Sequence, residues 1–190
     1  SHVFDVAYFS KQDEMDMLLR IQEEVLKTVV KYAPIAVKTP DNYEARANLM
    51  WTSSWAINGF INGGAAKAWS CHPMEHELSA YYDITHGLGL AILTPRWMEY
   101  CLKKDKGTLL RFVRFGKEVF GIECDDKEEA AKRTIEATAN FFFGTLGLKS
   151  RLSEVGIDTL HFKTMAKKAV GNGVLPGFVP LNAEDVENIY

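Results

Sequence analysis

Cysteine is scarce in this chain of 190 residues, and charge of either sign is not in large excess. Cys71, Cys101 and Cys124 are an odd number without a C-x-x-C pair, which favours a reducing compartment over a disulfide framework. The net charge of −3 gives no reason to expect nucleic-acid or membrane-surface partners. No apolar run reaches membrane-spanning length, and no secretion signal is apparent. We therefore expect a cytoplasmic protein with neither kind of partner.

Strand patterns and glycine-rich phosphate loops are also missing. No stretch of four or more alternating β-branched residues is bounded by turns, so strands should be few or absent. No G-x-G-x-x-G motif follows a predicted strand, and the Gly87-Leu88-Gly89 run is too short to replace it. The sequence therefore predicts an all-α fold with one domain, residues 1–190, that lacks a nucleotide-binding domain.

Helical spacing accounts for most of the chain and predicts a compact bundle of about seven or eight helices. Pro34 should bend or interrupt its helix, Pro95 should kink its helix, and Pro73 should lie in a first turn. Ser10 and Asp13 resemble a capping box. The predicted helical segments are 1–9, 15–37, 43–61, a helix capped near Ser70 or His72, 86–103, 105–120, 127–146, 161–170 and a last turn at 183–190.

Three of the five histidines, His72, His76 and His86, lie within the segment WSCHPMEHELSAYYDITHGLGLAIL, residues 69–93. A spacing of four places His72 and His76 on one face of a helix. Imidazole is the commonest protein metal ligand, and Glu75 and Glu77 lie beside these histidines. The cluster favours a divalent ion of the iron or zinc type, and a hydrogen-bonded structural cluster is the alternative.

A second interpretation uses the same residues differently. His72-Pro-Met-Glu75-His76 matches H-x-x-E-H, in which two histidines bind zinc and the glutamate activates water for peptide hydrolysis. The motif has only three fixed residues and needs a further carboxylate downstream. Pro73 is also awkward within the regular helix that the motif requires. A zinc metallopeptidase and a non-catalytic helical metal-binding domain therefore stand as alternatives.

The segment CHPMEHELSAYYDITHGLGLAILTPRWMEY resembles the signature of the iron-containing (group III) alcohol dehydrogenases. YEARANLMWTSSWAINGF and PLNAEDVENIY extend the resemblance over essentially the whole chain, which is most similar to the butanol dehydrogenase and NADPH-dependent aldehyde reductase branch. The resemblance implies the C-terminal, metal-binding domain of a dehydroquinate synthase-like fold. It also implies that the family's N-terminal nucleotide-binding domain is absent from these residues.

Each histidine acquires a role from this resemblance. His72 and His86, fourteen residues apart, fall on metal ligands, and His76 falls on a histidine that moves a proton beside substrate and nicotinamide. His2 falls on the histidine of the family's D-x-x-x-H pattern, whose aspartate would lie three residues before Ser1. The implied cofactors are Fe²⁺ or Zn²⁺ and, in the intact enzyme, NAD(P)H.

The resemblance also implies a substrate class and an assembly. Short-chain alcohols such as butanol, together with their aldehydes, would be interconverted, and the isolated domain should be inactive or nearly so. Among the aromatic residues near the signature, Phe60 and Trp69 are the first candidates for an apolar substrate pocket. The family commonly forms dimers, so the resemblance allows a homodimer, and the sequence leaves the oligomeric state open.

Overall fold

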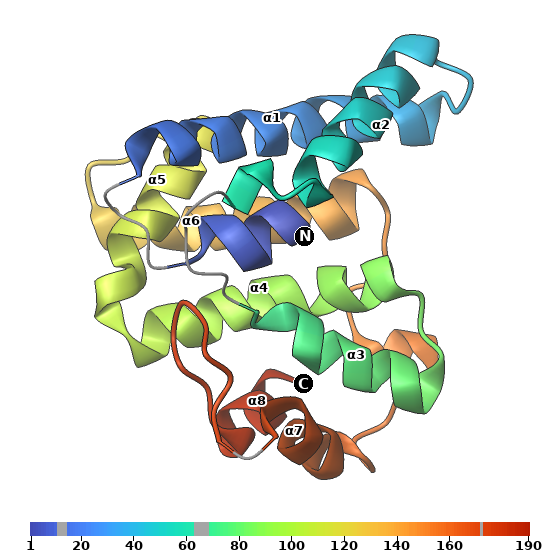
Figure 1. Ribbon diagram of the computed structural model, residues 1–190, viewed down its shortest axis with the longest axis vertical. Helices are drawn as coiled ribbons and strands as arrows, with labels where there is room; N and C mark the ends of the chain where they lie inside the picture. The colour runs from blue at the N-terminus through green and yellow to red at the C-terminus, as the bar shows by residue number, and fades with distance from the viewer. Residues whose placement is uncertain (11–14, 63–68, 172) are drawn as a thin grey trace.

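The computed structural model describes residues 1–10, 15–62, 69–171 and 173–190. Within these ranges the regular secondary structure is helical, and the one isolated antiparallel bridge pairs Leu175 with Leu181 (Figure 1). The all-α prediction is therefore confirmed. In chain order the helices are η1 (His2–Tyr8), α1 (Asp16–Lys38), α2 (Tyr43–Ile57), η2 (Phe60–Asn62), α3 (Cys71–Tyr82), α4 (His86–Lys104), η3 (Lys106–Thr108), α5 (Leu109–Phe120), α6 (Lys127–Ala139), η4 (Asn140–Thr145), η5 (Leu152–Val155), α7 (Phe162–Val170) and α8 (Ala183–Ile189).

The short helix η1 lies in the middle of the bundle. In Figure 1 it runs between α1 and α2 above and α4 below, while α7 packs against α3, and α8 packs against α7 and α4. Helix η1 is π-type, and the Phe9 backbone N–H donates to the Phe4 carbonyl at 3.0 Å. Residues 3–9 are all buried, as expected for a helix that is apolar around nearly its whole circumference.

Aromatic side chains join η1 to the surrounding helices. The Phe9 ring is fully buried, and its centroid lies 4.5 Å from Phe4, 5.6 Å from Trp97 of α4 and 5.0 Å from Phe112 of α5. Such offset and edge-on ring pairs add to the free energy gained by burying apolar area. The core therefore fixes η1, and with it the start of the chain, against α4 and α5.

Prolines lie within three of the helices. Pro34 does not interrupt α1, so that one of the two outcomes predicted for it does not occur, and α4 runs through Pro95. Pro95 lacks the N–H that would donate to the Ala91 carbonyl, and the Arg96 guanidinium donates to the next carbonyl, that of Ile92, at 2.6 Å. Pro73 is the third residue of α3, as predicted for a first turn.

Several predicted boundaries shift. The segment predicted as 43–61 is helical as α2 only to Ile57, and Gly59 then adopts a positive φ of 86° that favours glycine. The segment predicted as 127–146 changes from α6 to the π-type helix η4 at Asn140. Ser10 donates to the Ala7 carbonyl at 2.6 Å, and its predicted capping partner Asp13 lies outside the described residues.

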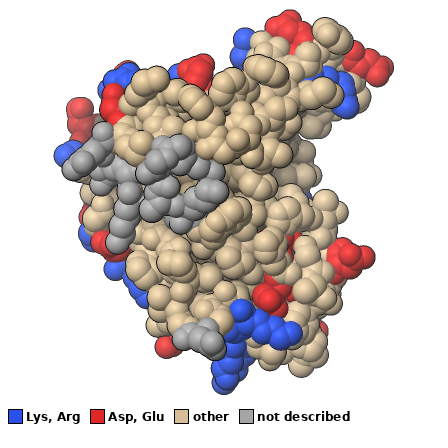
Figure 2. Space-filling view, in the orientation of Figure 1, with Lys and Arg blue, Asp and Glu red and all other residues tan. Residues whose placement is uncertain are grey.

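On the face seen in Figure 2, Lys, Arg, Asp and Glu side chains lie mainly toward the edges. Where the centre of this face is described, it is formed largely by residues of the other types. Several large apolar side chains of α2 and the following segment are exposed, including Trp51 (67%) and Phe60 (55%). None of the described helices is both long and apolar enough to span a membrane.

Candidate metal centre

Helix α3, which carries two of the signature histidines, is capped by a residue from η1. Ser70 occupies the N-cap position but makes no side-chain capping bond. Instead, the Asp5 carboxylate accepts hydrogen bonds from the backbone N–H groups of Ser70 (3.1 Å), Cys71 (3.0 Å) and His72 (3.1 Å). These are orphan donors of a helix N-terminus, where negative charge is also favourable. The capping fixes the first turn of α3 against η1.

The same carboxylate orients the His72 ring. His72 Nδ1 lies 2.8 Å from Asp5 Oδ2, and the side chains are 2% and 0% exposed respectively. Because a carboxylate only accepts hydrogen bonds, Nδ1 carries the proton and Nε2 presents a lone pair. That Nε2 is buried and has no hydrogen-bond partner among the described residues. A buried nitrogen without a partner calls for an explanation, and a metal ion supplies one.

The four histidines from η1, α3 and α4 lie next to one another. The His72 ring centroid is 4.8 Å from that of His2 and 5.5 Å from that of His86. The His76 centroid is 5.5 Å from His86, with the rings nearly stacked at 26°. Imidazoles that bind one ion at about 2.1 Å have ring centres roughly 5 Å apart. The fold therefore brings all the histidines singled out in the sequence into one region.

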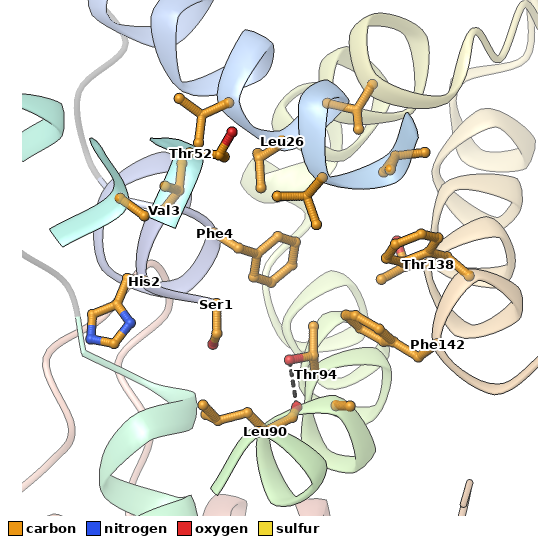
Figure 3. Close-up of a pocket in the computed structure, with 18 of the residues that line it drawn as sticks. Ser1, His2, Val3, Phe4, Leu26, Thr52, Leu90, Thr94, Thr138 and Phe142 are labelled. Carbon is orange, nitrogen blue, oxygen red and sulfur yellow. Dashed lines mark hydrogen bonds between the residues drawn. The ribbon is translucent and has the colours of Figure 1, made fainter. Parts of the chain in front are cut away.

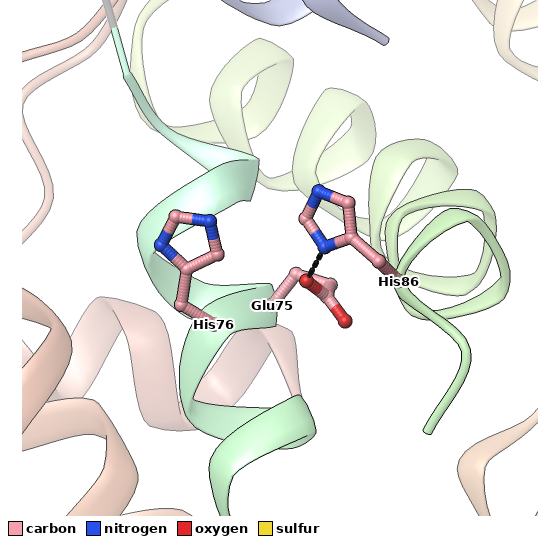
Figure 4. Close-up of side chains that lie close together, drawn as sticks. All are labelled: Glu75, His76 and His86. Atoms are coloured by element: carbon pink, nitrogen blue, oxygen red, sulfur yellow. Dashed lines mark hydrogen bonds and ion pairs between the residues drawn. The ribbon is translucent and has the colours of Figure 1, made fainter. Parts of the chain in front are cut away.

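One group of three potential ligand atoms within the described part of the chain includes a carboxylate. Glu75, His76 and His86 each offer an atom within 4.8 Å of the other two (Figure 4). His2 and His72 lie beside this group. Glu75 Oε2 is in direct contact with His86 Nδ1. We therefore interpret Glu75 as a hydrogen-bond partner of His86.

Burial distinguishes the members of the cluster. Glu75 is fully buried, and its other oxygen accepts a hydrogen bond from the Ser79 hydroxyl at 2.6 Å. His76 is exposed, and the His86 side chain is 45% exposed. Partial burial lowers the pKa of His2, and the nearby His72 adds to this effect. Solvent and small molecules therefore have access to the His76–His86 side of the cluster.

The two residues predicted for the substrate pocket differ in position. Trp69 is 37% exposed, and its ring lies edge-on to His72 at 5.0 Å and to His2 at 6.2 Å. Phe60 is more exposed and packs against Trp55 at 5.5 Å. Trp69 therefore borders the histidine cluster, whereas the ring contact described for Phe60 is with α2.

An apolar cavity of about 480 Å³ begins beside His2 (Figure 3). Residues of η1, α1, α2, α4, α5, α6 and η4 line it, and Figure 3 shows Phe4 and Phe142 pointing into it from two sides. Gly87, next to His86, also borders the cavity. The cluster thus has an apolar space on one side and solvent on the other.

Sequence reasoning missed Asp5 and assigned no orienting role to Glu75. One signal was available for Asp5: it is the only charged residue in the otherwise apolar run from Val3 to Phe9. A carboxylate in a buried segment needs hydrogen-bond donors, since burying it unpaired is costly. The identity of those donors could not be read from the run itself.

A model of the C-terminal region of the Fe-containing alcohol dehydrogenase family matches residues 1–190. The chain is 51% identical to NADH-dependent butanol dehydrogenase A of Clostridium acetobutylicum, covering 100% of this chain and 49% of that protein. It is 33% identical to the NADPH-dependent aldehyde reductase YqhD of Escherichia coli, covering 88% and 42%.

Solved structures agree with the sequence comparison. Butanol dehydrogenase A from Thermotoga maritima superimposes with a TM-score of 0.87 at 33% identity, covering 99% of this chain and 48% of the other. The aldehyde reductase YqhD from E. coli gives a TM-score of 0.89 at 29% identity, covering 100% and 49%. The chain spans about half the length of the curated relatives it matches. It belongs to the iron-containing alcohol dehydrogenase family and corresponds to the C-terminal region of that family.

Proposed function

We propose that these residues form the metal-binding half of an NAD(P)-dependent enzyme that interconverts short-chain alcohols and aldehydes. His2, His72 and His86 would hold a divalent ion, and His76 would move the proton. The observation that carries the proposal is the buried His72 Nε2, which has a free lone pair and no hydrogen-bond partner among the described residues. The names of the relatives, butanol dehydrogenase and aldehyde reductase, supply the substrate class.

The donor set fits an iron- or zinc-type ion. Three neutral imidazoles suit these metals far better than Mg²⁺ or Ca²⁺, which prefer oxygen ligands. Iron is favoured because it gives the family its name, and zinc is the alternative. When bound, the ion acts as a Lewis acid that stabilises negative charge on the substrate oxygen. The residues of this chain contribute preformed nitrogen positions, since η1 and α3 are already joined through Asp5.

His76 is the proposed proton-transfer residue. Its side chain is exposed and stacks against the proposed ligand His86 at 5.5 Å, so it can reach both solvent and a molecule beside the ion. Imidazole is the most frequent general acid or base in enzymes. Trp69, edge-on to His72, is the better placed of the two proposed pocket residues to contact a substrate's hydrocarbon part. Phe60 stays a prediction.

Nicotinamide binding is proposed to lie mainly outside residues 1–190. The relatives named as NADH- or NADPH-dependent are about twice as long as this chain. We infer a separate α/β nucleotide-binding domain in the intact protein, so residues 1–190 alone should have little or no dehydrogenase activity. The nicotinamide, when bound, supplies the hydride chemistry. The homodimer and the cytoplasmic location stay predictions.

The metallopeptidase alternative assigns Glu75 the task of activating water. The Glu75 carboxylate is fully buried and engaged with His86 and Ser79, which argues against that role. A non-catalytic metal-binding domain would use the same histidines without any turnover. Only a measurement of activity distinguishes this non-catalytic hypothesis from the proposed dehydrogenase.

The test uses the intact protein that contains these residues, loaded with Fe²⁺ or Zn²⁺. Butanol with NAD⁺ or NADP⁺, and butyraldehyde with the reduced cofactors, are followed by nicotinamide absorbance. We expect metal-dependent turnover that His72→Ala abolishes. Absence of turnover in the metal-loaded protein with both cofactors would overturn the proposal. Peptide hydrolysis that Glu75→Gln removes would establish the peptidase instead.

A further inference from the structure

We propose that Asp5 and Glu75 are positioning residues for the metal ligands. Each carboxylate holds the Nδ1 of one histidine, so that the Nε2 of the same imidazole is left to bind the ion. This inference rests on the proposed metal site and assigns its supporting residues. Two buried carboxylates from different helices each contact the Nδ1 of a different histidine: Asp5 with His72, and Glu75 with His86. Metal-ligating histidines commonly donate their second nitrogen to such a carboxylate, which sets the tautomer and the ring orientation.

Hydrogen-bond donors occupy both oxygens of the Asp5 carboxylate. Oδ1 accepts from the N–H groups of Ser70 and Cys71, and Oδ2 accepts from the N–H and the Nδ1 of His72. A carboxylate has about four lone-pair positions, which matches these four donors, whereas the oxygen of an asparagine amide has two. The ring of His72 is therefore held in the Nδ1–H tautomer, and only Nε2 can bind an ion.

Glu75 contacts His86 across the interface between α3 and α4, where Gly89 has no side chain to block it. The glutamate extends from α3 to the start of α4, where Oε2 contacts His86 Nδ1 and Oε1 accepts from Ser79 at 2.6 Å. Gly89 lies on the path: a Cβ at this position would fall 2.7 Å from Glu75 Cγ and 2.7 Å from Oε1. Any larger residue at position 89 must displace the Glu75 side chain.

This geometry offers a matched pair of variants. Gly89→Ala adds one methyl group and moves the Glu75 carboxyl group away from His86 without changing any titratable residue. Gly87→Ala adds the same methyl group two residues earlier in α4, where a Cβ meets no atom within 4 Å. Both glycines lie in α4, so the gain in helix propensity is shared by the two variants. A difference between them reports displacement of Glu75.

The first measurement is the Zn²⁺ affinity of the chain, by competition with a chromophoric chelator. Gly89→Ala and Glu75→Gln should each weaken binding about 10- to 100-fold, the usual effect of losing such a partner, while Gly87→Ala stays near the wild-type value. His86→Ala is the reference for loss of a ligand. Unchanged affinity in both Gly89→Ala and Glu75→Gln would overturn the proposal. A loss in Glu75→Gln as complete as in His86→Ala would also overturn it, because Glu75 would then be a ligand itself.

The second measurement reads the tautomers directly and needs neither metal nor activity. In ¹⁵N-labelled, metal-free protein, two-bond ¹H–¹⁵N correlations should report Nδ1–H tautomers for His72 and His86. Gly89→Ala should change the pattern of His86 and leave that of His72. An Nε2–H tautomer at either histidine in the wild-type chain would contradict the assignment. This readout tests Asp5 without a variant, since Asp5→Asn leaves buried donors of α3 unpaired and endangers folding.

Failure of this inference is distinguishable from failure of the proposed function. Zn²⁺ affinities and tautomers that match the expectation, combined with an intact protein that turns over no alcohol, would leave the positioning roles intact and remove the dehydrogenase. Metal-dependent turnover of alcohol, combined with unchanged Zn²⁺ affinity in both Glu75→Gln and Gly89→Ala, would leave the dehydrogenase intact and remove the positioning roles.

Discussion

His72 and Asp5 are 67 residues apart in the sequence, yet His72 Nδ1 lies 2.8 Å from the Asp5 carboxylate and both side chains are buried. The contact joins the first helix of the chain to the helix that carries two signature histidines. The contact occupies Nδ1, and the second ring nitrogen of His72, Nε2, has no hydrogen-bond partner among the described residues. The predictions begin with this nitrogen.

Removing His72 or His86 should remove most of the bound metal. Each alanine variant deletes a proposed nitrogen ligand, so Zn²⁺ affinity should fall more than the roughly 10- to 100-fold caused by losing a supporting partner. Metal content after dialysis, measured by elemental analysis, checks this. His161→Ala is the control, because His161 lies at the start of α7, outside the cluster, with its ring tilted against that of Tyr81 at 4.9 Å. Equal metal retention in all three variants would place the metal elsewhere.

Replacing His76 should affect turnover and leave the metal in place. In the intact protein, His76→Gln should lower kcat about 10²- to 10⁴-fold, the usual contribution of a general acid or base. The exposed side chain of His76 has little packing to lose, so the unfolding temperature should change little. A His76→Gln variant that has lost its metal would instead identify His76 as a ligand.

Asp185 should make the fold less stable in acid. Burial raises the pKa of Asp185, but hydrogen bonds from the Lys104 ammonium (2.5 Å), the Asn182 N–H (2.7 Å) and the Tyr100 hydroxyl (2.7 Å) outweigh it and lower that pKa below 3.8. A depressed folded-state pKa stabilises the protein above the unfolded value, and this contribution is lost as pH falls through the folded-state pKa.

The matching variant is Asp185→Asn. At neutral pH it should reduce the free energy of unfolding by about 1–2 kcal/mol, because Lys104 is partly exposed and its contribution is screened by solvent. The difference from wild type should shrink below pH 3.8, measured by urea unfolding. Glu187→Gln, an exposed change on the same helix, serves as the control. A pH-independent difference would mean that packing, and not charge, accounts for the effect.

The three thiols should differ strongly in reactivity. Cys71 and Cys101 are fully buried, and burial raises the pKa of Cys101, which suppresses its thiolate. Cys124 is only half-buried and lies near the surface loop before α6. A disulfide reagent should therefore label one thiol rapidly and the other two only as the chain unfolds. Cys124→Ser should eliminate the fast phase; two fast thiols in the wild type would show that a buried site opens readily.

Gly116 should tolerate no side chain where α5 crosses α6. A Cβ at residue 116 would fall 3.0 Å from the Thr134 Cβ and clash with its hydroxyl, which already donates to the Ala130 carbonyl at 2.8 Å. Gly116→Ala should therefore lower the free energy of unfolding by about 1–3 kcal/mol, despite the better helix propensity of alanine. Lys117→Ala, the exposed neighbour, should change it little. Denaturant unfolding of both variants checks the expectation.

Much of the fold was predictable because helical periodicity is a local property. The spacing of apolar residues placed α1, α4 and α5 nearly at their observed bounds, and Pro73 in a first turn was predicted correctly. The differences arose where the backbone conformation changes: α2 ends at Ile57, before Gly59 with its positive φ, and α6 gives way to the π-type helix η4 at Asn140.

The sequence alone determined the residue types of the candidate site, the all-α class and the family. Histidine spacing identified the cluster because residues four apart share a helix face whatever the surrounding fold. Tertiary structure decided which carboxylate serves which imidazole: Asp5 faces His72 from another helix, and Glu75 reaches His86 across the space left by Gly89. Contacts between helices depend on how whole faces pack, and no spacing within one helix encodes that arrangement.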